Sequence, residues 1–150
     1  MKIEFNKEKI KEISKKILDK AIKESSKNKT AKVLAFSGDL GAGKTTIVKE
    51  IAKLLGIKEN IISPTFVIMK IYKINPKSSY FSNFKKLVHI DAYRLESYKE
   101  MQKIGWEELE KDKDNLIIIE WPEKVKEIIS NKSFKIELSH IDEENRSIKF

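Results

Sequence analysis

Gly38-Asp39-Leu40-Gly41-Ala42-Gly43-Lys44-Thr45-Thr46 matches the pattern G-x-x-x-x-G-K-[ST] in full. Residues 32–37 precede it and contain an unbroken apolar run, which predicts a buried strand. Residues 46–55 follow it with apolar side chains at helical spacing. The pattern therefore lies between a strand and a helix, the context in which it binds the phosphates of a nucleotide.

Each residue type in this loop has a chemical reason. The glycines let the backbone curl so that successive N–H groups point at an anion, and the helix N-terminus adds further donors. We expect Lys44 to contact the outer phosphates and the Thr45 hydroxyl to bind Mg²⁺. The residues expected to bind the nucleotide are Gly38, Asp39, Leu40, Gly41, Ala42, Gly43, Lys44, Thr45 and Thr46. The alternative, a turn that only joins a strand to a helix, is disfavoured by the full pattern.

The composition indicates one globular domain, residues 1–150. Hydrophobic residues make up 40% and charged residues 36%, and no apolar run approaches the ~20 residues of a membrane span. The first residues lack the apolar core of a signal peptide, and the absence of cysteine excludes disulfides and thiolate metal sites. We expect a cytoplasmic protein with no membrane partner.

The net charge of +8 raises the question of nucleic-acid binding. Only Arg94 and Arg146 are arginines, and the many lysines are spread along the chain, often beside glutamates. No basic motif interleaved with aromatic residues is present. We therefore favour a solvated lysine surface over a dedicated RNA-binding stripe.

The rest of the chain alternates between expected strands and helices. Strands are predicted at 2–5, 32–37, 66–74, 86–91 and 116–120, with a hairpin formed by 134–141 and 147–150. Helices are predicted after Asn6, from 46 to Gly56, over 97–110 in two pieces separated at Gly105, and from Pro122 to 129. This order predicts an α/β fold: a three-layer sandwich like that of P-loop NTPases, with a mostly parallel central sheet, helices on both faces and the C-terminal hairpin at the edge.

Two acids end apolar strands, where open sheets bind ligands. Glu120 has the position at which P-loop proteins keep a second acid on the metal side, and Asp91 ends another strand in the same way. One of them is expected to bind Mg²⁺ while the other orients the attacking water or completes the metal shell. The alternative is that either acid caps a loop or pairs with a lysine.

Other polar and aromatic residues are weaker candidates. Thr65, in a Ser-Pro-Thr turn, could sense the γ-phosphate as switch loops do. Arg94 could equally reach a phosphate or brace a carboxylate. Trp121 is expected to pack beside the phosphate-binding loop, with contact to a partner as the alternative. His89 is expected at the sheet surface near the acids, and a structural role is favoured for both His89 and His140.

Four motifs in this order resemble the bacterial TsaE (YjeE-type) ATPase family. They are residues 38–46, then Ser63-Pro64-Thr65-Phe66, then His89-Ile90-Asp91-Ala92-Tyr93-Arg94-Leu95, then Ile119-Glu120-Trp121-Pro122-Glu123. The first is shared by many nucleotide-binding proteins, whereas the other three in succession are specific. The polar stretch 75–83 is longer than this family leads us to expect, and Asn6 stands where the family often has Ser or Thr.

The resemblance implies a part in making N6-threonylcarbamoyladenosine in ANN-decoding tRNAs. A TsaE protein binds ATP with Mg²⁺ and hydrolyses it to ADP on a complex of the transferase TsaD and its partner TsaB. Hydrolysis is expected to reset that complex between rounds. It meets tRNA only indirectly, through that complex. The residues that the resemblance implies are Lys44 for the phosphates, Thr45 and Glu120 for Mg²⁺, Asp91 for hydrolysis, Thr65 for a switch loop and Arg146 near the nucleotide.

Two other functions remain open. A small-molecule or nucleoside kinase of the P-loop class would need an acceptor pocket and usually an arginine-rich lid, which is hard to build with two arginines. A GTP-dependent switch would need a guanine-recognising Asn-Lys-x-Asp motif. The nearest match, Asn28-Lys29-Thr30-Ala31, lacks the aspartate and precedes the phosphate-binding loop.

Overall fold

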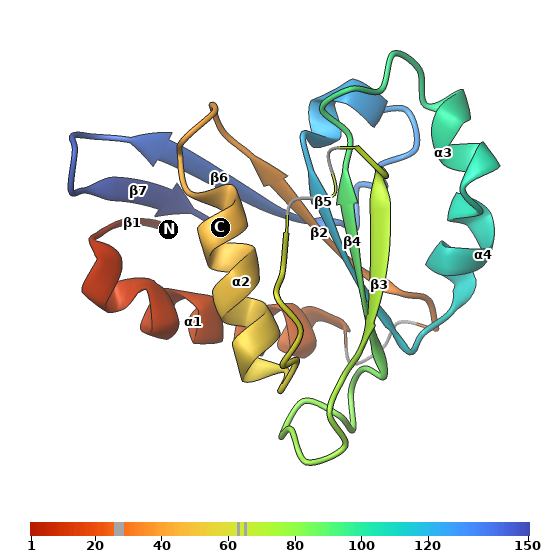
Figure 1. The fold of residues 1–150 in the computed structure, drawn as a ribbon, viewed down its shortest axis with the longest axis horizontal. Helices are drawn as coiled ribbons and strands as arrows, with labels where there is room; N and C mark the ends of the chain where they lie inside the picture. Colours follow the sequence, from red (N-terminus) through yellow and green to blue (C-terminus); the bar gives the residue numbers. More distant parts are fainter. Residues whose placement is uncertain (26–28, 63, 65) are drawn as a thin grey trace.

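The structure is a computed structural model that describes residues 1–25, 29–62, 64 and 66–150. Within these residues the strands form one seven-stranded sheet in the order β1-β7-β6-β2-β5-β4-β3 (Figure 1). The strands are β1 (Lys2–Phe5), β2 (Lys32–Ser37), β3 (Met69–Lys73), β4 (Lys86–Asp91), β5 (Asn115–Glu120), β6 (Phe134–His140) and β7 (Arg146–Lys149).

The strands that run parallel are the four in the middle, β6, β2, β5 and β4. The outer strands β3, β7 and β1 are antiparallel to their neighbours. This mixed sheet confirms the predicted α/β class, with its parallel part concentrated at the centre. The predicted hairpin is β6–β7, and β1 pairs outside β7, so the hairpin lies one strand in from the edge.

Helices cover both faces of the parallel strands (Figure 1). The helices are η1 (Lys7–Lys9), α1 (Ile10–Ser25), α2 (Lys44–Leu54), α3 (Lys99–Lys103), α4 (Trp106–Lys111) and η2 (Pro122–Val125), where η marks a 3₁₀ helix. Alternation along β5 separates the two cores: Leu116 and Ile118 pack with α1 and α2, whereas Ile117 and Ile119 pack with α3 and α4. No helix in the described ranges is long and apolar enough to cross a membrane.

Two predicted elements are shorter in the structure. The strand predicted from residue 66 begins at Met69, because Ile68 has a left-handed φ of 67° that interrupts an extended chain. The helix predicted from Pro122 to 129 ends as a 3₁₀ turn at Val125, which is its one buried residue. The pair of short helices around Gly105 is confirmed, with Gly105 in the left-handed conformation between them.

The polar loop that follows β3 is docked on the first two helices. The hydroxyl of Tyr80 donates to Oδ1 of Asp19 on α1 at 3.0 Å. The hydroxyl of Ser78 donates to the carbonyl of Leu54 at the end of α2, also at 3.0 Å. Burial, assisted by the hydrogen bond to Asp19, raises the pKa of Tyr80 to about 12. The loop is therefore part of the packed structure, with the neutral phenol as its anchor.

We predict that Tyr80 gives the protein a pH-dependent stability at high pH. Because its folded pKa is raised, its contribution is complete below the unfolded pKa of about 10 and is lost as pH rises toward 12. Tyr80→Phe should cost about 1 kcal/mol at neutral pH, and this difference from the unmutated protein should shrink above pH ~10. Urea unfolding of both proteins at several pH values measures it, and a pH-independent difference would contradict the anchor role.

We predict that two glycine substitutions differ in their effect on stability. Gly56 ends α2 and Gly105 precedes α4, with φ of 71° and 86°, so alanine costs roughly 1 kcal/mol of backbone strain at either. At Gly56 the new β-carbon would also lie 2.6 Å from Cβ of Asn75, whereas at Gly105 it meets open space. Gly56→Ala should therefore lower the free energy of unfolding by about 1–3 kcal/mol more than Gly105→Ala. Equal losses of stability for the two variants in thermal or urea unfolding would show that the loop carrying Asn75 moves to relieve the contact.

Candidate functional site

A cleft of about 350 Å³ opens where β4 and β5 end beside the start of α2. Its walls come from segments far apart in the sequence: the 38–46 loop, the end of β4 with the turn after it, and the end of β5 with the residue after it. The lining residues are Leu40, Gly41, Gly43, Lys44, Thr45, Thr46, Asp91, Tyr93, Glu120 and Trp121. The parallel strands thus present their polar ends to the loop that carries the phosphate-binding pattern.

The loop can curl only because of its glycines. Gly38, Gly41 and Gly43 have φ of 143°, 78° and 99°, which residues with a β-carbon rarely adopt. A β-carbon on Gly38 would also lie 2.5 Å from the carbonyl oxygen of Leu138 on β6. Gly38 therefore sets how closely the loop approaches the sheet, and Gly43 gives the turn from which α2 begins.

Lys44 has its ammonium group folded back over the loop. Its Nζ donates to the carbonyl oxygens of Gly38 and, at 3.0 Å, Asp39, and lies 4.2 Å from the centre of the Trp121 ring. Burial lowers the pKa of Lys44, and the negative charges nearby, with that of Glu120 foremost, oppose this shift. The cation thus lies at the cleft with carbonyl and aromatic partners that a phosphate oxygen could replace.

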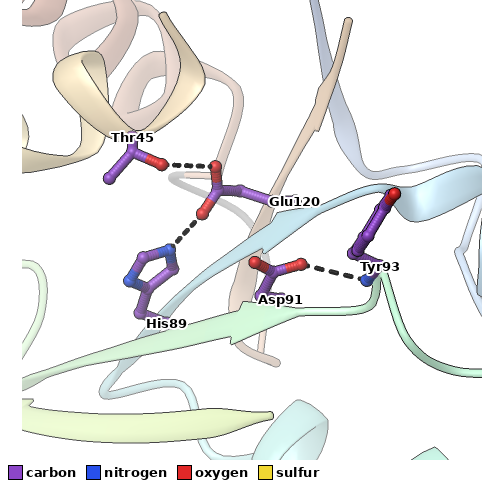
Figure 2. A network of polar contacts seen from close by, with 5 residues as sticks. All are labelled: Thr45, His89, Asp91, Tyr93 and Glu120. Atoms are coloured by element: carbon purple, nitrogen blue, oxygen red, sulfur yellow. Dashed lines mark hydrogen bonds and ion pairs between the residues drawn. The ribbon is translucent and has the colours of Figure 1, made fainter. Parts of the chain in front are cut away.

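Glu120 lies between a threonine and a histidine, and each of its carboxylate oxygens has a different partner (Figure 2). Oε1 accepts from the hydroxyl of Thr45 at 3.1 Å, and Oε2 lies 2.7 Å from Nε2 of His89. Glu120 and His89 are buried, with 2% and 0% of their surfaces exposed. The end of β5 is therefore connected to the start of α2 through one carboxylate.

Asp91 lies on the strand beside Glu120, and the two acids are paired in the register of β4 and β5. Its Oδ1 accepts from the backbone N–H of Tyr93 at 2.9 Å, which caps the turn after β4 (Figure 2). It also lines the cleft. The structure thus brings Asp91, Glu120 and Thr45 to one place, and Asp91 has the cap geometry that the sequence left open as an alternative.

These donors suit a hard cation, because hydroxyl and carboxylate oxygens are the ligands that Mg²⁺ prefers. Within the described residues, no group of three or more His, Cys, Asp or Glu side chains could hold a metal ion. The protein therefore offers part of a coordination shell. Such a site suits an ion that keeps its waters and shares the oxygens of a bound phosphate.

A second hollow, of about 120 Å³, adjoins the same loop. It shares Gly41, Gly43 and Thr46 with the main cleft, and Asn6 and Arg146 contribute to its other walls. Nη1 of Arg146 donates to the carbonyl oxygens of Asp142 and Asn145 at 2.7 and 3.0 Å, so the guanidinium is braced by the β6–β7 turn. Arg146 thus borders the phosphate-binding loop from the C-terminal hairpin.

Other candidates have different surroundings. Thr65 lies outside the described residues, as does Ser63. Arg94 is exposed, with its guanidinium carbon 4.3 Å from the centre of the Phe66 ring, and among the described residues it neither lines the cleft nor pairs with a carboxylate. Trp121 packs on Lys44 and lies 5.0 Å from the ring of Tyr93, centre to centre.

The two histidines differ in their surroundings. His140 is exposed at the end of β6. His89, expected at the sheet surface, is fully buried and contacts Glu120. The sequence signal that could have found this contact is the spacing of His89 and Asp91, which puts both side chains on one face of β4. The sequence did not indicate which side chains would lie above that face.

Comparison with known proteins gives a consistent result. The family model "Threonylcarbamoyl adenosine biosynthesis protein TsaE" matches residues 6–148. A protein of Rickettsia felis named tRNA threonylcarbamoyladenosine biosynthesis protein TsaE is 40% identical over 115 residues, which are 76% of this chain and 61% of that protein. A protein of the same name from Bacillus subtilis is 33% identical over 122 residues, 81% of this chain and 70% of that one.

A solved structure agrees in fold. The crystal structure of YdiB from Bacillus subtilis superposes with a TM-score of 0.66 at 26% sequence identity, covering 99% of this chain and 82% of that chain. The aligned region spans about three fifths of the Rickettsia felis relative. With the family model matching nearly the whole chain, and with relatives above 30% identity over most of it, this protein belongs to the TsaE family.

Proposed function

We propose that this chain binds ATP with Mg²⁺ in the cleft and hydrolyses it to ADP in support of threonylcarbamoyladenosine synthesis on tRNA. The family it belongs to is named for that biosynthesis. The single observation that carries the ATPase proposal is the convergence of Lys44, Thr45 and Glu120 around one cleft beside a glycine-rich loop. These are a cation for phosphate and two oxygen donors for its metal.

The polyphosphate is held by the loop and by Lys44. The backbone N–H groups of the 38–46 loop and the start of α2 supply donors and partial positive charge. Lys44 exchanges the carbonyl oxygens of Gly38 and Asp39 for phosphate oxygens, since an anion is the stronger acceptor. The same exchange makes burial of the ammonium group less costly.

Thr45 and Glu120 would hold Mg²⁺, with Asp91 as the neighbouring acid. When bound, the ion neutralises developing charge on the phosphates. Glu120 keeps its carboxylate beside the Thr45 hydroxyl, and Asp91 stands one strand away, where it can accept a proton from, or orient, the attacking water. We assign the nucleoside to the hollow between Asn6 and Arg146. This hollow adjoins the phosphate-binding loop, and the C-terminal hairpin forms one of its walls.

The proposed setting is the cytoplasm, and the proposed partners are TsaD and TsaB, with tRNA reached through their complex. Hydrolysis then resets that complex between rounds. This part of the proposal rests on family membership. The geometry adds one supporting feature. Within the described residues the cleft lining holds two carboxylates and no histidine, so a strong general base is lacking and turnover should depend on partners.

We predict that Lys44→Ala weakens ATP binding by roughly 30-fold or more, because a charge-assisted contact worth about 2 kcal/mol is removed. Lys49→Ala, on the solvent side of the same helix, should bind as the unmutated protein does. Titration calorimetry with a non-hydrolysable ATP analogue measures both. Equal affinities for the two variants would contradict the assignment of the phosphate site.

We predict that Glu120→Gln reduces Mg²⁺-dependent hydrolysis by about 10-fold or more while leaving metal-free nucleotide binding largely intact. The amide keeps the size of the side chain and removes the charge that would face the ion. Phosphate release is measured for the chain alone and with TsaD and TsaB added. Normal turnover in the variant would move the metal role to Asp91. Transfer of phosphate to a hydroxyl compound would favour the kinase. Rapid turnover by the unmutated chain without TsaD and TsaB would count against partner control.

A further inference from the structure

His89 is a buried polar residue that the phosphate site as described above does not use. It lies in the middle strands, on β4, with none of its surface exposed. Glu120 lines the cleft, whereas His89 contacts Glu120 from the side away from Thr45 (Figure 2). The imidazole is therefore one layer removed from the space where a nucleotide would bind.

The position of the proton on His89 follows from the contact. Nε2 and Oε2 of Glu120 are 2.7 Å apart, a distance that requires a proton between them. The tautomer that carries a proton on Nε2 makes the imidazole the donor and Oε2 of Glu120 the acceptor, as Oε1 already is toward Thr45. Nδ1 is buried and has no hydrogen-bond partner among the described residues. Whether it carries a proton or not, this buried nitrogen is left unpaired, which costs about 1–3 kcal/mol. The tautomer with Nε2–H supplies the donor that this contact requires.

A side chain that only packed the core would need no hydrogen-bond partner. Leu87, two residues earlier on the same face of β4, is fully buried and apolar. An apolar residue at position 89 would fill the same layer without leaving a ring nitrogen unpaired. What the imidazole adds is one directed donor to Glu120, and the rotation of a carboxylate is fixed when each oxygen has its own partner.

We propose that His89 is the positioning residue of the metal-side acid. Through Nε2–H it donates to Oε2 of Glu120 and leaves Oε1 directed at the Thr45 hydroxyl, where Mg²⁺ would be shared. This inference rests on the proposed function, because it assigns His89 a role in the Mg²⁺ site of that same cleft. Its consequence is specific: loss of the donor should weaken the contribution of Mg²⁺ to nucleotide binding rather than nucleotide binding itself.

The binding test compares two amides. In His89→Gln the amide nitrogen reaches about as far as Nε2, whereas in His89→Asn it stops near the position of Nδ1. ADP binding is measured by calorimetry with Mg²⁺ and with EDTA. The readout is the dissociation constant in EDTA divided by that in Mg²⁺, which is large when Mg²⁺ tightens binding. We expect His89→Asn to reduce this ratio by about 10-fold or more and His89→Gln to keep it within about 3-fold, with the EDTA values nearly unchanged for both.

The outcomes separate this inference from the proposed function. If the unmutated protein binds ADP equally well with and without Mg²⁺, the proposed metal site itself is wrong. If Mg²⁺ tightens binding in the unmutated protein and equally in both variants, the site stands and the positioning role of His89 is overturned. Val88→Ala, on the opposite face of β4, controls for general loosening of the strand and should leave the ratio unchanged.

A spectroscopic test needs no substitution at position 89. The chain has only two histidines, so His140→Gln leaves His89 as the one imidazole to observe by ¹⁵N NMR. We expect Nε2 to carry a proton. A ring protonated on Nδ1 and not on Nε2 would overturn the inference. This result remains decisive if either amide variant fails to fold.

Discussion

The site depends on the parallel register of β2, β5 and β4. Phe36 is opposite Glu120, and Glu120 is opposite Asp91, so the loop after β2 and both acids emerge at one edge of the sheet. Backbone hydrogen bonds extend this register past the strands, from Trp121 to the carbonyl of Phe36 and from Ala92 to that of Glu120. A shift of one residue in either pairing would turn an acid to the opposite face of the sheet, because side chains alternate along a strand.

The register also brings opposite charges together inside a partly buried cleft. Lys44 is 6% exposed, Asp91 5% and Glu120 2%. Buried charges cost free energy unless each is paired or hydrogen-bonded, and each of the three side chains is hydrogen-bonded. Lys44 donates to backbone carbonyls, Asp91 accepts from a backbone N–H, and Glu120 contacts Thr45 and His89. Two carboxyl groups and one ammonium group line the cleft, which supports the proposal that a metal ion enters it together with a polyphosphate.

The sequence predicted most of this architecture because its strongest signals are local. These signals are the glycine-rich pattern at 38–46, the apolar run of β5 and the helix boundaries at Gly56 and Gly105. Each depends only on neighbouring residues, and each appears in the fold. β3 is shorter than predicted because of the backbone angles at Ile68, and η2 is shorter because the helix ends where Val125 is buried. Neither feature is encoded in a local sequence pattern. The contact of His89 with Glu120 depends on strand order, since the two residues meet only because β4 and β5 are neighbours.

Trp121 shows how local strain and the site are connected. It has φ of 60° and ψ of 51°, a left-handed conformation that costs a bulky residue roughly 1–2 kcal/mol. Proline at position 122 then fixes the next φ and starts η2, so the chain turns sharply just after Glu120. That turn is what brings the indole over the Lys44 ammonium group and against Tyr93. An extended residue at 121 would continue β5 and carry the ring away from the loop. The strain is therefore offset, at least in part, by a cation–π contact and an aromatic contact that only this backbone conformation allows.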